Sequence, residues 1–400
     1  MHAEERKTRW ATPLLVAASL LVAVAMAEIV LRTFLPAPRS YGVWPPHLKV
    51  TFHPTPGLMP GIDGPSLFTV NALGLRGDEW SDGDRYRILA IGGSTTESLY
   101  LDDSEAWPRI LQDLLNAERP RGGVWVGNAG RSGLNSRHHV IHTMRLLEQH
   151  PGIDAIILTA GINDLHHRLS LDVDFRPIEQ EPRSHFKRLY QESFAVLPEL
   201  PPSLPLFAPV ELRHRIARLG AREAQTPPAQ QQDAAGLSYA RWRRHRREAS
   251  ALRSELPDLG SALREYAFNL QTIVGLARRH EARVVLATQP VLWRADIPAE
   301  SRALLWMGGV GNFQAEPKHE YYTVAALAEA MARYNETLLA VCARSGVECV
   351  DLAAALPRDT RVFYDDCHFN ESGARLVAEH FAQHFRSERI AAAESRIGVP

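Results

Sequence analysis

The feature of this 400-residue sequence that most restricts its fold is the alternation of short apolar runs with helical segments. Apolar residues recur at helical spacing over 107–115, 136–150, 324–341 and 370–385. Between them lie five aliphatic runs with the length of buried parallel strands, at 87–93, 124–130, 155–161, 282–290 and 347–352. This order predicts an α/β fold with a five-stranded parallel sheet covered by helices on both faces.

The alternation stops between about 166 and 265. A proline-rich stretch at 197–209 is followed by a strongly basic helical stretch at 239–256, so we interpret this region as a helical insertion or a cap over the sheet edge. Its arginines are typical of a solvated helix face, and contact with anionic lipid or an acidic glycan is the alternative. They are Arg241, Arg243, Arg244, Arg246 and Arg247.

The N-terminus carries Arg6, Lys7 and Arg9, and residues 11–27 then contain no charged side chain. Because roughly 20 residues of helix span a bilayer core, segment 11–35 predicts a signal anchor or a signal peptide. The small residues around Met26 fit a cleavage site, whereas the apolar continuation toward residue 35 fits an uncleaved transmembrane helix. A buried soluble helix is the remaining alternative. The basic flank at 1–10 is expected in the cytoplasm, with the bulk of the chain outside it, periplasmic or extracellular, and secreted after any cleavage.

The other segments follow from composition. Residues 36–85 are rich in proline and glycine and indicate a linker and lead-in, followed by one domain over 86–390 and a tail over 391–400. A net charge of -1 gives no reason to expect nucleic-acid binding. In an oxidising compartment Cys342 and Cys349 could pair across their turn, or they remain two separate buried thiols.

Polar residues with chemical potential fall at strand ends, where parallel sheets bind ligands. Ser94 directly follows Gly92 and Gly93 after the first strand, which directs its hydroxyl and N–H toward the strand ends. The motif "NAGRSG" after the second strand offers glycine N–H groups that a ligand oxygen can approach closely. After the third strand, Asn163 supplies a neutral amide donor suited to a developing oxyanion.

The stretch "YDDCHFNESG" follows the fifth strand and precedes the last helix. A serine hydroxyl is a weak nucleophile unless a base removes its proton, and the base needs an orienting acid. Residues three apart lie on one side of a helical turn, so Asp365 is a better partner for His368 than Asp366. A Cys367–His368 nucleophile pair, a metal site and an ordinary polar loop are the alternatives.

These motifs resemble the four sequence blocks of the SGNH hydrolases, the GDSL esterase/lipase superfamily. The matching segments are "IGGSTTES", "NAGRSG", "GIND" and "DDCH", and the resemblance covers about half the chain. It implies a flavodoxin-like three-layer α/β/α sandwich that needs no metal or organic cofactor. It also implies a triad of Ser94, His368 and Asp365, and an oxyanion hole formed by the N–H groups of Ser94 and Gly133 and by the Asn163 amide. Choosing Gly133 over Gly130 rests on its place in the block.

The sequence departs from the family pattern at the nucleophile. Gly-Gly-Ser stands where the family usually has Gly-Asp-Ser. Membrane-anchored bacterial members often have a similar Gly-Gly-Ser-Thr, and their pre-catalytic segment resembles "VNALGLRGDEW" at 70–80. His138 and His142 have helical ligand spacing, but no recognisable metal motif accompanies them, which favours ordinary hydrogen-bonded or surface histidines.

Together these observations predict an exported, membrane-anchored serine esterase that forms an acyl-enzyme. The expected substrate is an O-acyl ester, with acetyl as the expected group, on a cell-envelope or extracellular carbohydrate, and lipid esters come second. The alternatives are an O-acyltransferase acting on an envelope glycan and a non-catalytic glycan-binding subunit with a degenerate triad.

Overall fold

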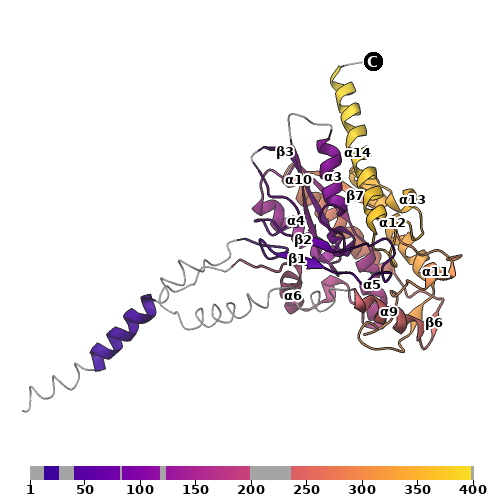
Figure 1. Cartoon of the computed structure of the whole chain (residues 1–400), viewed down its shortest axis with the longest axis horizontal. Coiled ribbons are helices and arrows are strands. Elements are labelled where there is room, and N and C mark those ends of the chain that lie inside the picture. Colours follow the sequence, from indigo (N-terminus) through magenta and orange to yellow (C-terminus); the bar gives the residue numbers. More distant parts are fainter. Residues whose placement is uncertain (1–12, 27–39, 82, 118–122, 199–235, 398–400) are drawn as a thin grey trace, which may run out of the picture. The chain divides into compact units, whose positions relative to one another are not determined.

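The computed structural model describes residues 13–26, 40–81, 83–117, 123–198 and 236–397. A five-stranded parallel sheet lies at its centre, in the order β4-β3-β5-β7-β9. Its members coincide with the five predicted runs: β3 (Asp84–Gly92), β4 (Gly123–Gly130), β5 (Ala155–Thr159), β7 (Arg283–Ala287) and β9 (Glu348–Val350). Figure 1 labels β3 and β7 of this sheet. In chain order this is the flavodoxin-like arrangement 2-1-3-4-5. The prediction of an α/β fold with a five-stranded parallel sheet is confirmed.

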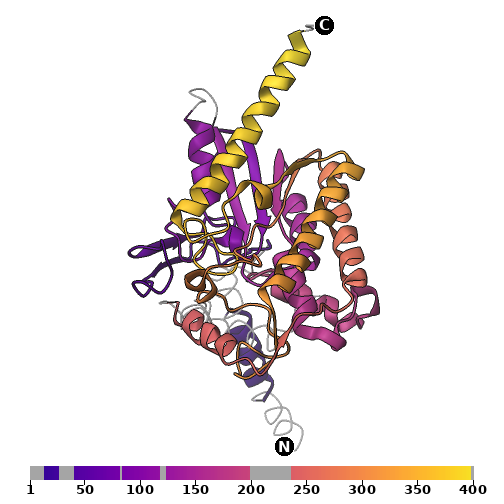
Figure 2. The ribbon, with the colours of Figure 1, turned by 90° about the vertical axis from the view of Figure 1, so that its right-hand side faces the viewer.

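Helices cover both faces of the sheet, as Figure 2 shows. On one face α3 (Trp107–Asn116) packs against α14 (Glu371–Ile397). On the other, α10 (Gly260–Arg279) packs against both α4 (Ser136–Gln149) and α12 (Val324–Ser345). Every side chain of β5 is buried, which explains why this strand has a continuous apolar run instead of an alternating one.

The lead-in is more ordered than its composition indicated. From residue 41 onward it belongs to the same compact unit as the sheet and contains an antiparallel pair, β1 (Lys49–Phe52) with β2 (Ser66–Thr69). The aromatic side chains of Trp44, Phe52 and Phe68 are buried there and contact one another edge to face. Burial of these rings orders a segment whose proline and glycine content favoured irregular structure.

The region around 166–265 is helical where the structure describes it, and 199–235 lie outside the described residues. It runs from α5 (Ile162–Leu171) to the start of α10. The intervening elements are the 3-10 helices η1 (Asp172–Asp174) and η2 (Ile178–Gln180), then α6 (Arg183–Ser193), α9 (Leu237–Arg247) and β6 (Leu252–Arg253), which pairs with β8 (Tyr321–Tyr322). Because α10 covers the sheet, the last part of the predicted insertion belongs to the sandwich.

The basic helix α9 differs from a fully solvated helix. Arg243 is buried and donates to the carbonyls of Leu58, Leu304 and Tyr364. Arg246 donates to two further carbonyls. The interpretation of all five arginines as a solvated face is therefore wrong for these two, because their guanidinium groups satisfy buried backbone oxygens. Three others, Arg241, Arg244 and Arg247, are exposed.

Three single-turn helices complete the domain: α2 (Ser94–Glu97), α11 (Ala299–Arg302) and α13 (Leu352–Ala355). Cys342 near the end of α12 forms a disulfide with Cys349 in β9. Of the predicted N-terminal segment, 13–26 form a helix, and 11–12 and 27–35 lie outside the described residues. Within the part of the chain that the structure describes, no helix has the length and apolar character needed to cross a membrane.

Candidate active site

Ser94 begins α2 immediately after β3, and the two preceding glycines allow this tight turn. A Cβ atom on Gly92 would lie 2.1 Å from Thr96 Oγ1, and one on Gly93 would lie 2.5 Å from Asn163 Nδ2. Neither distance is possible for a real side chain, so only glycine brings β3, α2 and α5 this close together. The serine is consequently held at the carboxyl end of the sheet, next to Asn163.

A chain of hydrogen bonds joins three predicted residues that lie far apart in the sequence. Ser94 Oγ lies 2.7 Å from His368 Nε2, and His368 Nδ1 lies 2.6 Å from Asp365 Oδ2. The other carboxylate oxygen, Asp365 Oδ1, accepts the backbone N–H groups of Cys367 and His368 at 3.0 and 2.8 Å. With the Nδ1 proton donated to Asp365, His368 Nε2 is free to accept the hydroxyl proton of Ser94.

The electrostatics of this chain favour an ion pair. Burial lowers the pKa of His368, but the Asp365 carboxylate outweighs burial and raises that pKa well above its ordinary value of 6.5. Burial likewise raises the pKa of Asp365, but the charge of His368 and the hydrogen bonds to the carboxylate lower it overall. Asp365 is therefore ionised and stabilises positive charge on the imidazole.

Asp366 has different partners although it is the adjacent residue. It accepts the Trp293 indole N–H at 2.7 Å and the backbone N–H groups of Trp306 and Met307 at 2.8 and 3.2 Å. Burial and the charge of Asp365 raise the pKa of Asp366 to about 6. The indole of Trp306 donates to Asp365 at 2.9 Å, so one tryptophan holds both carboxyl groups. The imidazole is thus paired with Asp365, in agreement with the three-residue spacing.

The glycine loop after β4 distinguishes Gly133 from Gly130. The N–H of Gly130 donates to Asn128 at 2.8 Å, and a Cβ there would lie 2.2 Å from the backbone N of Glu97. Gly133 has φ of 79° and open space beside it. Among the described residues we find no acceptor for the Gly133 N–H, which leaves it available to a substrate oxygen. Gly130 therefore serves close packing, whereas Gly133 keeps an N–H with open space beside it.

Asn163 is the second residue of α5 and lies beside this loop. Its amide nitrogen donates to the backbone oxygen of Leu134 at 2.8 Å, which fixes its orientation. An amide nitrogen carries two hydrogens, so one remains for a ligand. The structure therefore places the Asn163 amide against Gly93 and within the same strand-end region as Ser94.

Arg76, in the segment 70–80, donates hydrogen bonds to the end of α2 and to the residues that follow it. Its guanidinium group is buried and donates to the carbonyls of Glu97, Ser98 and Leu101, each at 2.6 Å. It also pairs with Asp103 at 2.9 Å. The carbonyls at the C-terminal end of a one-turn helix have no partners within the helix. This arginine supplies donors to the carbonyl at that end and to two carbonyls just beyond it. Sequence reasoning missed this role, and its only signal was the family-like segment 70–80.

Two aromatic rings cover the imidazole, one from α9 and one from the segment just before His368, and the sequence did not predict this. The ring of Tyr364 stacks on His368 with centroids 5.4 Å apart, and Tyr239 lies edge-on to both rings. Trp242 follows on the same helix and contacts Tyr239. The available signal was the three-residue spacing of Tyr239 and Trp242 in the basic stretch, which places both on one helix face.

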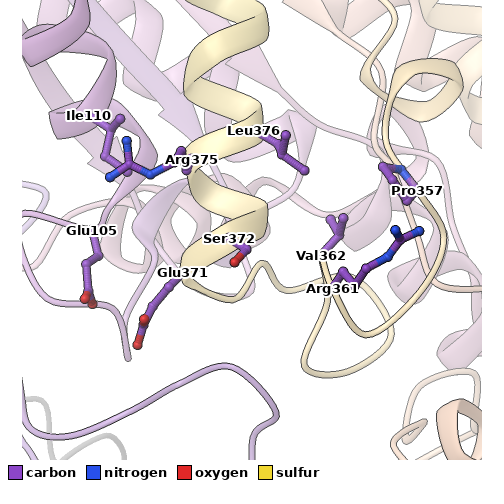
Figure 3. Close-up of a pocket in the computed structure, with 9 residues that line it drawn as sticks. All are labelled: Glu105, Ile110, Pro357, Arg361, Val362, Glu371, Ser372, Arg375 and Leu376. Atoms are coloured by element: carbon purple, nitrogen blue, oxygen red, sulfur yellow. The ribbon is translucent and has the colours of Figure 1, made fainter.

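Two cavities differ in size and in their distance from the hydrogen-bond chain. A small one of about 10 Å³ touches the hydroxyl and imidazole, and its lining residues are Ser94, Thr95, Ser98, Tyr100, Leu101, Tyr364, His368 and Phe369. A larger one of about 450 Å³ opens between the starts of α3 and α14 (Figure 3). It is lined by Glu105, Ile110, Pro357, Arg361, Val362, Glu371, Ser372, Arg375 and Leu376. None of these nine residues belongs to the hydrogen-bond chain, so the smaller cavity is the one relevant to its chemistry.

The alternative nucleophile and metal sites are not favoured by the geometry. Burial raises the pKa of the Cys367 thiol to about 11, so it carries no thiolate at neutral pH. The side chains of Asp365, Cys367 and His368 are close enough to hold a metal ion. However, Asp365 Oδ2 and His368 Nδ1, two of the possible ligand atoms, are hydrogen-bonded to each other. His138 is bonded to Asn135 as part of a helix cap, and the His142 ring donates to the Ser193 carbonyl.

Comparison with known proteins gives one strong match. The sequence model of the GDSL-like lipase/acylhydrolase family matches residues 90–376, more than half of the chain. No curated protein matches the sequence. Among solved structures, LAE5, an α/β hydrolase from the metagenome of Lake Arreo, Spain, is similar with 13% identity and a TM-score of 0.40 over 75% of this chain and 94% of that one. Axe2, an acetylxylan esterase from Geobacillus stearothermophilus, is similar with 15% identity and a TM-score of 0.39 over 75% and 94%.

Proposed function

Because the chain belongs to the GDSL-like lipase/acylhydrolase family, we propose that Ser94, His368 and Asp365 are the catalytic triad of this ester-hydrolysing serine hydrolase. The observation that carries the proposal is the unbroken hydrogen-bond chain from Asp365 through His368 to the Ser94 hydroxyl. Nucleophile, base and orienting acid are recognised by such geometry and not by sequence position.

The reaction follows from this arrangement. His368 Nε2 takes the hydroxyl proton as Ser94 Oγ attacks the ester carbonyl, and Asp365 stabilises the resulting imidazolium. The carbonyl oxygen becomes negative and accepts hydrogen bonds from the N–H groups of Ser94 and Gly133 and from the Asn163 amide. His368 then returns the proton to the leaving alcohol. A water molecule, activated by the same imidazole, releases the acid from the acyl-enzyme.

The substrate we propose is a small O-acyl ester, with acetyl as the acyl group. The cavity beside Ser94 holds about 10 Å³ and is bounded by the rings of Tyr100, Tyr364 and Phe369. That space accommodates about one water-sized group, so a long acyl chain would require these rings to move. For the alcohol we propose a cell-envelope or extracellular carbohydrate, with lipid esters second, because we also propose that the catalytic domain lies outside the cytoplasm.

We propose that the catalytic domain lies outside the cytoplasm and that the N-terminal segment anchors it to the membrane. The basic cluster before the uncharged stretch 11–27 supports export. The disulfide between Cys342 and Cys349 also supports it, since such bonds persist mainly in oxidising compartments. Extraction of membranes with carbonate tests the anchor: the protein should stay in the pellet, and quantitative release into the supernatant would contradict it.

The enzymatic proposal is tested with p-nitrophenyl acetate and the full-length protein. Ser94→Ala should lower kcat by about 10⁴-fold or more, as expected when a triad nucleophile is removed. Cys367→Ala keeps the backbone N–H that binds Asp365 and should leave kcat within about 3-fold, because the thiol is protonated and buried. Turnover that survives Ser94→Ala would contradict the proposal. Acetate appearing on an added glycan would instead identify an acyltransferase.

A further inference from the structure

The glycine loop that carries Gly133 is tied down on both sides. On one side the Arg131 N–H donates to the Gly92 carbonyl at 3.2 Å, and on the other the Leu134 carbonyl accepts the Asn163 amide at 2.8 Å. Between them, the Ser132 hydroxyl is hydrogen-bonded to the carboxyl group of Glu97. Glu97 lies three residues after Ser94 on α2 and is fully buried.

We propose that Glu97 is a positioning residue that fixes the Gly133 N–H in the oxyanion hole through its hydrogen bond with Ser132. This inference rests on the proposed function, because it assigns a role within the same site. Gly133 has no side chain, and its φ of 79° and the open space beside it impose no packing restraint on the peptide. The bond at Ser132, one residue earlier, is therefore a side-chain restraint next to the proposed donor.

The surroundings of Glu97 favour its neutral form. Burial raises its pKa to about 7, although Ser132, Arg131 and Arg76 act in the opposite direction. Its second oxygen, Oε1, is buried and has no hydrogen-bond partner among the described residues. Arg131 is itself largely buried, which lowers its pKa, and the charges of Glu97 and of Glu192 on α6 act in the opposite direction. A protonated carboxyl can donate to Ser132 Oγ, whereas an ionised one would place negative charge beside the developing oxyanion.

The position of Glu97 couples the nucleophile to its electrophilic partner. α2 carries Ser94 at its start and Glu97 at its end, so one rigid turn presents the attacking oxygen and also grips the loop that binds the carbonyl oxygen. Arg76 fixes the carbonyl of Glu97 from the other side. A change at Glu97 should therefore alter transition-state binding more than ground-state binding of the ester.

The experiment compares Glu97→Ala, Ser132→Ala and the double variant with the full-length wild type, using p-nitrophenyl acetate. Each single change should lower kcat by about 10- to 100-fold with KM within about 3-fold, somewhat less than complete removal of an oxyanion donor. The double variant should fall no more than about 3-fold below the singles, because both changes break the same bond. Unchanged kcat in Ser132→Ala, or fully multiplicative losses in the double variant, would overturn the proposal.

Two further variants separate positioning from general stability. Ser104→Ala removes a matched hydrogen bond, from an exposed serine to Asp102 at 2.7 Å, and should leave kcat within about 2-fold. Glu97→Gln keeps the size of the side chain and can donate to Ser132, but cannot ionise. It should retain kcat within about 5-fold at pH 6 and give a higher ratio of kcat at pH 8 to kcat at pH 6 than the wild type, because only the wild-type carboxyl ionises over this range. A ratio no higher than that of the wild type would contradict the assigned role.

Hydrogen exchange of the peptide spanning 131–135 tests the tether without relying on turnover. Glu97→Ala and Ser132→Ala should both accelerate exchange of the Leu134 amide, which donates to Arg131 across the loop, while Ser104→Ala should not. Unaltered exchange in both loop variants would count against the proposal even if kcat fell. Failure of the proposed function is recognised separately, as activity that does not depend on Ser94, and the exchange result stands in either case.

Discussion

Asp365 and Asp366 are neighbours in the chain and are both completely buried, yet their hydrogen bonds lead to different groups. Asp365 binds the imidazole and one indole, whereas Asp366 binds one indole and two backbone N–H groups. The raised pKa of Asp366, about 6, and the lowered pKa of Asp365 show how strongly the partner decides the charge of a buried carboxyl. In the proposed triad Asp365 orients the base, whereas Asp366 holds the backbone at Trp306 and Met307.

This division predicts unequal effects of two isosteric changes. Asp365→Asn should lower kcat by about 10³- to 10⁴-fold, because an amide cannot stabilise the imidazolium or fix its tautomer. Asp366→Asn should lower kcat by less than about 10-fold, because the amide oxygen still accepts hydrogen bonds in the same place. Initial rates with p-nitrophenyl acetate decide between them, and a larger loss in Asp366→Asn would reverse the assignment of the orienting acid.

The pH dependence of the rate follows from the same pair. His368 must be neutral to accept the serine proton, and Asp365 raises its pKa well above 6.5, so kcat/KM should rise with pH to a midpoint above 6.5. Folding linkage has the opposite sign: the raised pKa stabilises the fold fully below 6.5, and this contribution is lost as pH rises through the folded-state pKa. In Asp365→Asn the residual kcat/KM should have its midpoint at lower pH. Profiles of kcat/KM from pH 5 to 9.5 measure the midpoints of the wild type and of Asp365→Asn. Equal midpoints in the two proteins would contradict the pairing.

The residues of the hydrogen-bond chain were predicted from the position of Ser94 after the first strand, from the three-residue spacing of Asp365 and His368, and from the resemblance of their motifs to the family blocks. The supporting residues were not predictable in this way. Arg76 reaches carbonyls more than 20 residues away, and Trp306 reaches both aspartates from about 60 residues away. Backbone oxygens and indole N–H groups at such distances leave no motif, since any residue type can supply a carbonyl.

At the scale of elements, α2 depends on groups outside itself. It has four residues, and Arg76 supplies donors to carbonyls at and just beyond its C-terminal end. Strands and long helices were predictable because each repeats its apolar pattern over several turns or residues. The antiparallel pair β1–β2 and the sheet-covering role of α10 were not, because proline and glycine masked the first and the irregular segment before it masked the second.

Arg76→Met should therefore destabilise the fold as well as the nucleophile turn. Removing the guanidinium leaves the carbonyls of Glu97, Ser98 and Leu101 buried without this donor, and the expected loss is about 3 kcal/mol in the free energy of unfolding. Arg333→Met breaks an exposed ion pair with Glu329 and should cost less than about 0.5 kcal/mol. Urea unfolding measures both, and equal losses would show that Arg76 has no special role.

At the scale of the whole molecule, the disulfide ties the last long helix before the edge strand to that strand. Cys342 in α12 and Cys349 in β9 are separated by seven residues, with Cα atoms 6.2 Å apart. Closing so short a loop restricts the unfolded chain by about 2 kcal/mol in the entropic treatment. In the sheet, β9 is separated from β3, the strand before Ser94, by β5 and β7, and neither cysteine belongs to the hydrogen-bond chain.

Replacing both cysteines by serine should lower the free energy of unfolding by about 2 kcal/mol and leave kcat within about 2-fold. Dithiothreitol should have the same effect on the wild type, whereas the double variant should not respond to it. Urea titration with and without the reductant is the measurement. A wild type whose unfolding midpoint ignores reductant would show that the two thiols do not pair in solution.

The hydroxyl and the imidazole that meets it are separated by 274 positions in the chain. A ribosome therefore finishes β3 and Ser94 long before it reaches His368, which follows the edge strand β9 in the chain. A nascent chain that ends before His368 therefore carries the Ser94 hydroxyl without the imidazole to which it is hydrogen-bonded. Under the proposed mechanism such a chain has no base for Ser94, so hydrolysis of a chromogenic ester reports only chains synthesised through His368.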